Sequence, residues 1–414
     1  MKQLLAFCMA AVTFLLPMPA YAFPLKGEDI QAEAAVLMDA DTGQILYSRN
    51  GEQRMAPASI TKIMTALLAL ENLDQEEVLI ASEEAVNLPD WGSSAGIQAG
   101  ERLTVRDTLY ALMLPSANEA GNILAEAVSG TQEQFVSLMN QRARELGAEG
   151  THFANAHGLP APAHYTTARD MAMITRQAIQ TAGFLDCAGA SAYTIPATNL
   201  SGERLLTHVH RMLRQDSDYF HPDVIGGKTG YTDEAGHTLV TIARREGRTL
   251  ICVVMKDDAY YEDTRTLLEY GFTSFSSAVY LWEHARPPVF TEQDDTVGTV
   301  TASFRIPGPV EFLLPTGAQL SQITVEYESS ILPQSREKSG AYANLILKIP
   351  EEPPLLLLSV PLELGSWAVT PLESVEAAAQ PAKENPKKII LLPFVLLLLP
   401  CFVAVRKKKG RHLK

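Results

Sequence analysis

The chain has 414 residues, which is enough for two or three domains. Its hydrophobic fraction of 46% and charged fraction of 20% are typical of a folded protein and exclude a disordered chain. All 48 Asp and Glu residues lie within residues 23–388, whereas seven of the 34 Lys and Arg residues lie in the two terminal segments. The body is therefore even more acidic than the net charge of −14 indicates, and it lacks the basic surface that nucleic-acid binding needs.

Both ends of the chain carry apolar segments typical of export and membrane anchoring. Residues 1–22 combine Lys2, an apolar stretch and an A-x-A pattern that ends at Ala22, which together predict a cleaved secretory signal. Residues 389–405 are uncharged, and six Lys and Arg follow in residues 406–414, a pattern that predicts a transmembrane helix with a cytoplasmic tail. A surface-lying amphipathic helix is the alternative, but this segment has no polar face. We expect a single-pass type I cell-membrane protein whose body lies outside the cytoplasm.

The body begins with two strand-like runs, residues 34–40 and 44–48, which predict a β-hairpin. Helical patterns follow, and two more strands and a closing helix end this region. The expected helices are 103–114, 119–128, 132–146, one that ends at 180, and 262–275, and the expected later strands are 237–243 and 249–255. Strands at both ends with helices between them predict an α/β fold, an antiparallel sheet flanked by helices. We expect this first domain to span residues 23–280.

From about residue 287 the pattern changes to short strands of alternating polarity. They lie at 296–304, 310–314, 322–327, 344–349 and 355–360. This spacing predicts a separate, small all-β domain, similar to a β-sandwich, over residues 287–369. Residues 370–388 are rich in Ala, Glu, Pro and Lys and have the composition of a linker.

The stretch with the clearest chemistry is Ser59-Ile60-Thr61-Lys62, which follows Pro57 and leads into an unbroken helix-forming run. This order places Ser59 near a helix N-terminus, and the spacing puts Ser59 and Lys62 on one helix face. A serine hydroxyl needs an adjacent base to become a nucleophile. Lys62 can be that base if burial or a second cation lowers its pKa. Taken alone, such a pattern is more often a capping serine and a solvated lysine.

A second motif, Ser116-Ala117-Asn118, follows the expected helix that stops at Pro115. The Ser116 hydroxyl can pass a proton between Lys62 and a leaving group. The Asn118 side chain can hold Lys62 and the amide of a substrate. Taken alone, Ser116 would be an ordinary helix cap.

A third motif, Lys228-Thr229-Gly230, precedes the two later strands. Lys228 adds a positive charge that lowers the pKa of Lys62 and attracts a substrate carboxylate. Thr229 can donate a hydrogen bond to that carboxylate, and Gly230 lets an extended substrate lie close along the strand edge. The ordered set S-x-x-K, S-x-N and K-T-G is the pattern of penicillin-binding serine enzymes.

In these motifs the chain closely resembles the low-molecular-mass penicillin-binding proteins that are serine-type D-alanyl-D-alanine carboxypeptidases. The resemblance covers about residues 27–275 and includes the stretches 157–159, 165–172 and 228–236. It implies a β-lactamase/transpeptidase-like fold, to which a membrane-tethered β domain is a fitting addition. The implied reaction removes the terminal D-alanine from peptidoglycan stem pentapeptides through an acyl-Ser59 intermediate. Penicillins would acylate the same serine, and neither a cofactor nor a metal is implied.

By the same resemblance, the backbone N–H groups of Ser59 and Tyr231 would form the oxyanion hole. The catalytic residues would be Ser59, Lys62 and Ser116, and the substrate-binding residues would be Asn118, Lys228, Thr229, Gly230 and Tyr231. The expected partners are peptidoglycan stem peptides, β-lactam inhibitors and the membrane. One departure concerns an arginine that some relatives carry before the last helix to bind the substrate carboxylate. Here Tyr260 and Tyr261 stand in that region, and Arg265 lies a turn later.

Three other functions share parts of this pattern. A peptidoglycan endopeptidase of the same fold would use the same motifs to cut peptide cross-links. A class A-like β-lactamase usually has Asp in place of Ala117 and a Glu-x-x-Leu-Asn loop, a sequence that does not occur between Asn118 and Lys228. A non-catalytic wall-binding protein would normally have lost one residue of the serine–lysine set, whose members are all present here.

Two further groups of residues bear on metals and redox state. His152, His157 and His164 lie close in sequence, but no carboxylate or cysteine stands at ligand spacing, so we expect loop structure there. Cys187 and Cys252 could form a disulfide, although Cys252 sits in an apolar run typical of a core residue. The sequence leaves this pairing open.

Overall fold

The computed structural model describes residues 25, 29–89, 92–282, 285–349 and 353–371. The expected signal peptide at 1–22 and the expected transmembrane helix at 389–405 lie outside these residues. Within the described part of the chain, no helix is both long and apolar enough to cross a membrane.

A five-stranded antiparallel sheet in the order β2-β1-β9-β8-β7 forms the centre of the first domain. Its strands are β1 (Ala34–Asp39), β2 (Ile45–Arg49), β7 (Val224–Thr232), β8 (Gly236–Arg245) and β9 (Arg248–Met255). The expected hairpin and both expected later strands are confirmed. β1 pairs along its whole length with β9, so the first and last strands of the domain meet in the middle of one sheet. β7 lies at an edge.

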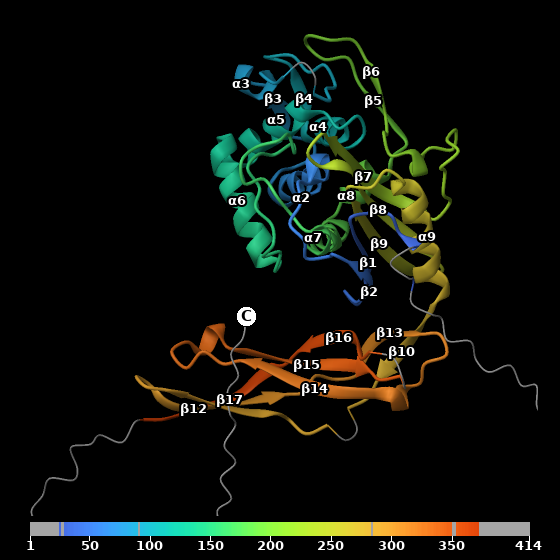
Figure 1. The fold of residues 1–414 in the computed structure, drawn as a ribbon. Coiled ribbons are helices and arrows are strands. Elements are labelled where there is room, and N and C mark those ends of the chain that lie inside the picture. Colours follow the sequence, from blue (N-terminus) through green and yellow to red (C-terminus); the bar gives the residue numbers. More distant parts are fainter. Residues whose placement is uncertain (1–24, 26–28, 90–91, 283–284, 350–352, 372–414) are drawn as a thin grey trace, which may run out of the picture.

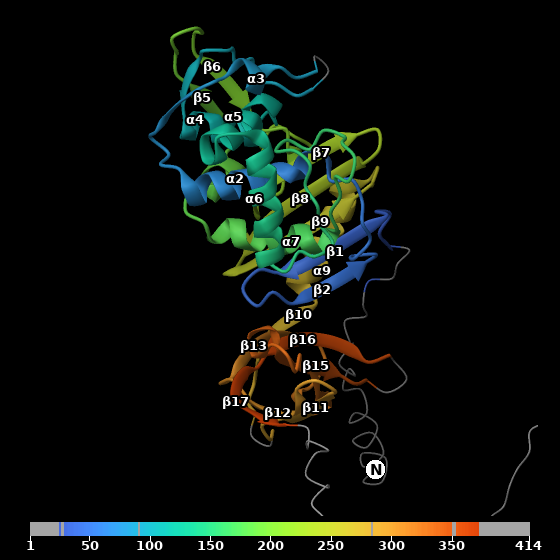
Figure 2. The same ribbon diagram turned by 90° about the vertical axis from the view of Figure 1, so that its left-hand side faces the viewer.

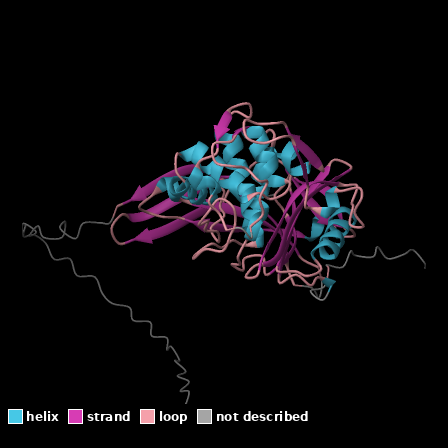
Figure 3. Cartoon of the chain, turned by 90° about the horizontal axis from the view of Figure 1, so that it is seen from above, coloured by secondary structure: helices cyan, strands magenta, loops and turns pink. Residues whose placement is uncertain are grey.

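Helices cover both faces of this sheet (Figures 1–3). On one face α9 (Tyr260–Thr273) packs Leu267 and Leu268 into the same apolar cluster as Leu37 of β1. On the other face the alternate side chains of β1, such as Val36 and Met38, join a larger cluster with the remaining helices. These helices are α2 (Lys62–Asn72), α3 (Glu83–Val86), α4 (Val105–Met113), α5 (Asn118–Ser129), α6 (Gln132–Glu145), α7 (Ala168–Gln180) and α8 (Phe184–Gly189).

The expected helices are present, with shifts at their ends that have local causes. The helix expected at 103–114 begins at Val105, because residues 102–104 form β4 (Arg102–Thr104) and Thr104 caps the helix with Asp107 in a capping box. β4 pairs with β3 (Val78–Ile80). A hairpin of β5 (Ala192–Ile195) and β6 (Arg204–Thr207) was not expected, because its strands are short and their sequences lack an apolar alternation.

The strands of the second domain form two three-stranded sheets that pack face to face. One sheet holds β11 (Val289–Asp294), β12 (Gly298–Arg305) and β17 (Glu363–Thr370), and the other holds β14 (Ile323–Ser330), β15 (Gly340–Leu347) and β16 (Leu355–Pro361). Phe304 of β12 and Ala343 of β15 share the core between them. β10 (Phe275–Tyr280), from the range expected for the first domain, pairs with β13 (Val310–Pro315), from the range expected for the second.

The two domains are joined by a buried polar contact. The Gln44 amide donates to the Leu313 carbonyl at 2.8 Å and accepts from the Leu313 N–H at 2.6 Å. Gln44 lies in the β1–β2 turn, at the opposite edge of the sheet from β7. The second domain therefore attaches away from that free edge (Figures 1 and 2).

Two glycines allow two segments of the chain to pack closely against the residues that precede α2. A Cβ at Gly158, whose φ is +90°, would lie 1.9 Å from the Ala58 carbonyl oxygen. A Cβ at Gly230 of β7 would lie 2.7 Å from the Ser59 nitrogen. Both distances are shorter than any real contact of this kind, so only glycine permits this packing.

We expect Gly158→Ala to lower the free energy of unfolding by about 2–4 kcal/mol, because it adds a steric clash to an unfavourable backbone conformation. Gly247 provides the matched control, since its φ is +86° and no heavy atom lies within 4 Å of a Cβ built there. Gly247→Ala should cost only about 1 kcal/mol, the conformational part alone. Urea unfolding of both variants measures the difference, and equal losses would show that the close approach at Gly158 is not a constraint.

Candidate active site

Ser59 lies in a strained turn at the start of the α2 helix. Residues Ala58–Thr61 form one turn of 3₁₀-helix, and α2 continues from Lys62, which confirms the expected place of Ser59 near a helix N-terminus. Ala58 has φ +49°, a left-handed conformation that costs an L-residue about 1–2 kcal/mol. Strain of this kind persists only where its surroundings hold it. The Pro57 carbonyl accepts from Thr238 Oγ1 at 3.0 Å, which ties the turn to β8.

Lys62 is fully buried, and its amine lies within hydrogen-bond distance of three oxygens. Its Nζ lies 2.9 Å from Ser59 Oγ, 2.7 Å from Asn118 Oδ1 and 2.6 Å from the His157 carbonyl oxygen. The amide and carbonyl oxygens can only accept hydrogen bonds, so a neutral Lys62 amine donates one N–H to each of them. Its lone pair then faces the Ser59 hydroxyl. This is the arrangement in which a lysine can take the serine proton.

The electrostatic surroundings favour that neutral form. Burial lowers the pKa of Lys62 well below its ordinary value, and the charge of Lys228 lowers it further, whereas Glu119 raises it. Burial disfavours an ammonium because the charge loses its hydration. The sequence-based expectation that burial and a second cation would act together is therefore met by the geometry.

Lys228 is the second buried amine, and it reaches the site from β7. Its Nζ donates to Ser116 Oγ at 2.9 Å and to the Thr229 carbonyl at 2.8 Å. Burial lowers the pKa of Lys228 to about 7. Ser116, between α4 and α5, has φ +67°, another strained conformation beside the reactive groups. Its hydroxyl accepts from Lys228 and keeps its own proton available for donation.

Asn118 begins α5 and is positioned by a loop that the sequence analysis did not single out. Its N–H donates to the Ser93 carbonyl at 2.8 Å. The neighbouring Glu119 is buried and accepts from Ser94 Oγ and the Ala95 N–H, each at 2.7 Å. These bonds fasten the loop to the start of α5. A single glutamate in a first helical turn carries no signal that could have revealed this.

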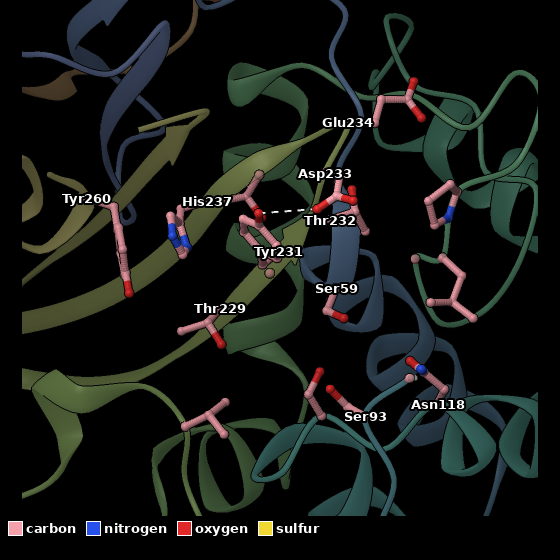
Figure 4. Close-up of a pocket in the computed structure, with 18 of the residues that line it drawn as sticks. Ser59, Ser93, Asn118, Thr229, Tyr231, Thr232, Asp233, Glu234, His237 and Tyr260 are labelled. Carbon is pink, nitrogen blue, oxygen red and sulfur yellow. Dashed lines mark hydrogen bonds between the residues drawn. The ribbon is translucent and has the colours of Figure 1, made fainter. Parts of the chain in front are cut away.

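A cavity of about 680 Å³ opens beside these groups (Figure 4). Six of the eight predicted site residues line it, namely Ser59, Ser116, Asn118, Thr229, Gly230 and Tyr231. The other two, Lys62 and Lys228, lie fully buried and bonded to lining serines. The structure thus brings all eight together, and the cavity runs along the free edge of β7, where an extended peptide can add as a strand.

One wall of the cavity is a row of aromatic rings that sequence reasoning missed as a unit. The rings of Tyr231 and His237 lie 4.7 Å apart, those of His237 and Tyr260 also 4.7 Å, and those of Tyr260 and Tyr261 4.3 Å. Figure 4 shows His237 between Tyr231 and Tyr260. Arg265 is not among the lining residues, whereas Arg211 is. No local pattern in the sequence indicates this approach of β8 to α9.

The remaining candidate groups have structural explanations. His152 forms a hydrogen bond with the Ala163 carbonyl, and His164 forms one with the Thr61 hydroxyl. Cys187 and Cys252 are both buried and free. Among the described residues, His221, Asp223 and Glu269 present ligand atoms within 4.8 Å of one another. Arg245 pairs with both of these carboxylates, at 2.7 and 2.5 Å, which accounts for the cluster as an ion-pair network.

Comparison with known proteins places this site in a family. The model of the Peptidase S11 family, described as D-alanyl-D-alanine carboxypeptidase, matches residues 21–259. The D-alanyl-D-alanine carboxypeptidase DacF of Bacillus subtilis is 33% identical over 60% of this chain, and the match spans 64% of that relative's length. DacB2 of Mycobacterium tuberculosis is 32% identical over 61% of this chain and 86% of its own length.

Solved structures agree with this assignment. The crystal structure of a D-alanyl-D-alanine carboxypeptidase from Mycobacterium tuberculosis covers 62% of this chain and 95% of its own, with 32% identity and a TM-score of 0.56. DacD from Francisella tularensis covers 84% of this chain and 97% of its own, with a TM-score of 0.61, and at 24% identity it shows the fold alone. The chain belongs to the D-alanyl-D-alanine carboxypeptidase family and is a serine-type carboxypeptidase, a hydrolase.

Proposed function

We propose that the enzyme removes the terminal D-alanine from peptidoglycan stem pentapeptides through an acyl-Ser59 intermediate and that penicillins acylate the same serine. The observation that carries this proposal is the 2.9 Å contact between Ser59 Oγ and the buried Lys62 amine. Neutral Lys62 accepts the hydroxyl proton as Ser59 Oγ bonds to the carbonyl carbon of the penultimate D-alanine. The carbonyl oxygen becomes an oxyanion, which the N–H groups of Ser59 and Tyr231 stabilise.

The second half of acylation needs a proton on the leaving group. Ser116 gives its proton to the amine of the departing D-alanine as the peptide bond breaks. The ammonium of Lys62 then returns the Ser59 proton to Ser116, which leaves Lys62 neutral again and Lys228 charged. Lys228 lies in hydrogen-bond contact with Ser116, at 2.9 Å. Water hydrolyses the acyl-enzyme and releases the shortened peptide.

Binding is assigned to β7 and Asn118. The edge of β7 takes the substrate backbone as an added strand, and Asn118 holds its amide. The D-alanine carboxylate is placed against Thr229 and the charge of Lys228. A cation at this position attracts the free carboxylate beside the scissile bond.

The nucleophile assignment predicts the place of a covalent label. A penicillin should add its mass to the tryptic peptide 55–62, which ends at Lys62 and contains Ser59. Mass spectrometry of the digested adduct locates it, with Ser59→Ala as the unlabelled control. Label on Ser116 instead would contradict the assignment.

The two lysines should respond differently to replacement by arginine. Lys62→Arg keeps the charge but removes the neutral form, so the acylation rate should fall by several orders of magnitude. Lys228→Arg keeps a cation near the carboxylate, so its milder loss should appear mainly in KM.

Their pH profiles sharpen this test. Because burial lowers the pKa of Lys228 to about 7, its charge is lost as the pH rises through that value, and kcat/KM should fall on the alkaline side. In Lys228→Arg this fall should move to higher pH, since arginine stays charged. A Lys62→Arg enzyme that acylates as fast as the parent would rule the mechanism out.

We further propose that residues 1–22 direct export and that residues 389–405 anchor the protein in the membrane, with the catalytic domain outside the cytoplasm. The uncharged C-terminal run and the basic residues after it support this arrangement. The stem peptides of the cell wall, which are the proposed substrates, lie on the same side of the membrane as the catalytic domain.

Truncation before Ile389 should release active enzyme into the medium, because all eight assigned site residues precede that position. Cell fractionation with a labelled penicillin follows the protein in both forms. A full-length protein that is found in the soluble fraction would contradict the anchor, and a folded but inactive truncation would give the tail a further role.

A further inference from the structure

The peptide group between Ala58 and Ser59 carries two atoms that matter for catalysis. One is the Ala58 carbonyl oxygen, and the other is the Ser59 N–H. In a trans peptide these two groups point in opposite directions from one rigid plane. Whatever fixes the direction of the Ala58 carbonyl therefore also fixes the direction of the Ser59 N–H.

A chain of hydrogen bonds from a histidine ends at that carbonyl. The Ala154 N–H donates to His164 Nδ1 at 2.8 Å, so Nδ1 carries no proton and Nε2 carries it. His164 Nε2 lies 2.9 Å from Thr61 Oγ1. Thr61 Oγ1 uses its only proton to donate to the Ala58 carbonyl at 2.8 Å. Thr61 Oγ1 must then accept a hydrogen bond from His164 Nε2. The direction of every hydrogen bond in this series is therefore fixed.

The chain is held in this state by its surroundings. Thr61 is fully buried and His164 is 7% exposed. Burial lowers the pKa of His164 to about 4, with smaller contributions from the charges of His152 and Lys62. His164 is therefore neutral at neutral pH, as the single-proton arrangement requires.

The same peptide group is confined on its other sides. Gly158 meets the Ala58 carbonyl so closely that a Cβ there would lie 1.9 Å from the oxygen. Gly230 of β7 meets the nitrogen of Ser59, where a Cβ would lie 2.7 Å away. The left-handed φ of Ala58, +49°, is thus maintained by contacts at both ends of the peptide group.

We propose that His164, acting through Thr61, is a positioning residue that aims the Ser59 N–H into the oxyanion hole. This inference rests on the proposed function, in which the Ser59 N–H is one of two oxyanion donors. Neither Thr61 nor His164 lines the catalytic cavity, so neither touches the substrate. Their effect should fall on the transition state, where the oxyanion exists, and not on substrate binding.

Thr61→Val removes the hydroxyl while keeping the shape of the side chain. We expect kcat for D-alanine release to fall about tenfold to a hundredfold, with KM within about twofold of the parent value. Thr61→Ser restores the hydroxyl and should recover kcat to within about threefold. Affinity for a peptide boronic acid, whose adduct on Ser59 places an oxygen in the oxyanion hole, should fall in step with kcat.

Thr175→Val is the matched control. Thr175 is also buried, and its hydroxyl donates to the Met171 carbonyl at 2.6 Å within α7. It should leave kcat and KM unchanged, which separates the loss of any buried hydroxyl from the loss of this one. If Thr61→Val fails to show the thermal transition of a folded protein, His164→Leu in the same assays decides.

The outcomes separate this inference from the proposed function. A parent enzyme that releases D-alanine, together with a folded Thr61→Val enzyme of parental kcat, overturns the role of His164 and Thr61 and leaves the proposed function standing. A rise in KM with unchanged kcat also overturns it. A parent enzyme that is not acylated at Ser59 overturns the proposed function itself.

Discussion

The burial of two lysine amines beside one serine is the constraint on which the site depends. Lys62 and Lys228 are both fully buried, and taking an ammonium out of water is costly unless it loses its proton or finds strong acceptors. The Lys62 amine lies within hydrogen-bond distance of three oxygens. The nearby charge of Lys228 disfavours a positive charge on Lys62. The result is an amine with a lowered pKa, as the proposed role of Lys62 as a base requires. Glu119 acts in the opposite direction and keeps the net charge of the region from rising further.

The fold brings these amines together from elements that have little else in common. Lys62 comes from a helix of the layer on one face of the sheet, and Lys228 comes from the edge strand β7. They can approach because Gly158 and Gly230 leave room for backbone atoms around the Ala58–Ser59 peptide group. The second domain adds nothing to this contact, since it is attached through Gln44 at the far edge of the sheet.

Local patterns predicted the parts of the fold that depend on local sequence. The β1–β2 hairpin, the helices other than the short α3 and α8, and the strands β8 and β9 followed from periodicity and turn residues. β11, β17 and the β5–β6 hairpin were missed because their exposed side chains show little alternation. The pairing of β10 with β13 was missed because its paired residues lie 30 to 40 positions apart in the sequence. In the site, contiguous motifs revealed the eight principal residues, whereas the places of His164, Glu119 and Arg211 depend on tertiary contacts that leave no mark on neighbouring sequence.

The most direct test of this account is the ionisation of the Lys62 amine, followed by NMR of 15N-labelled lysine side chains as the pH is raised. The Lys62 signal is identified by its loss in Lys62→Arg. The account predicts titration well below the ordinary range of lysine, and a higher pKa for Lys62 when Lys228 is replaced by methionine, because the second charge is then absent. A Lys62 amine that stays protonated up to its ordinary pKa, near 10.5, would contradict the central claim.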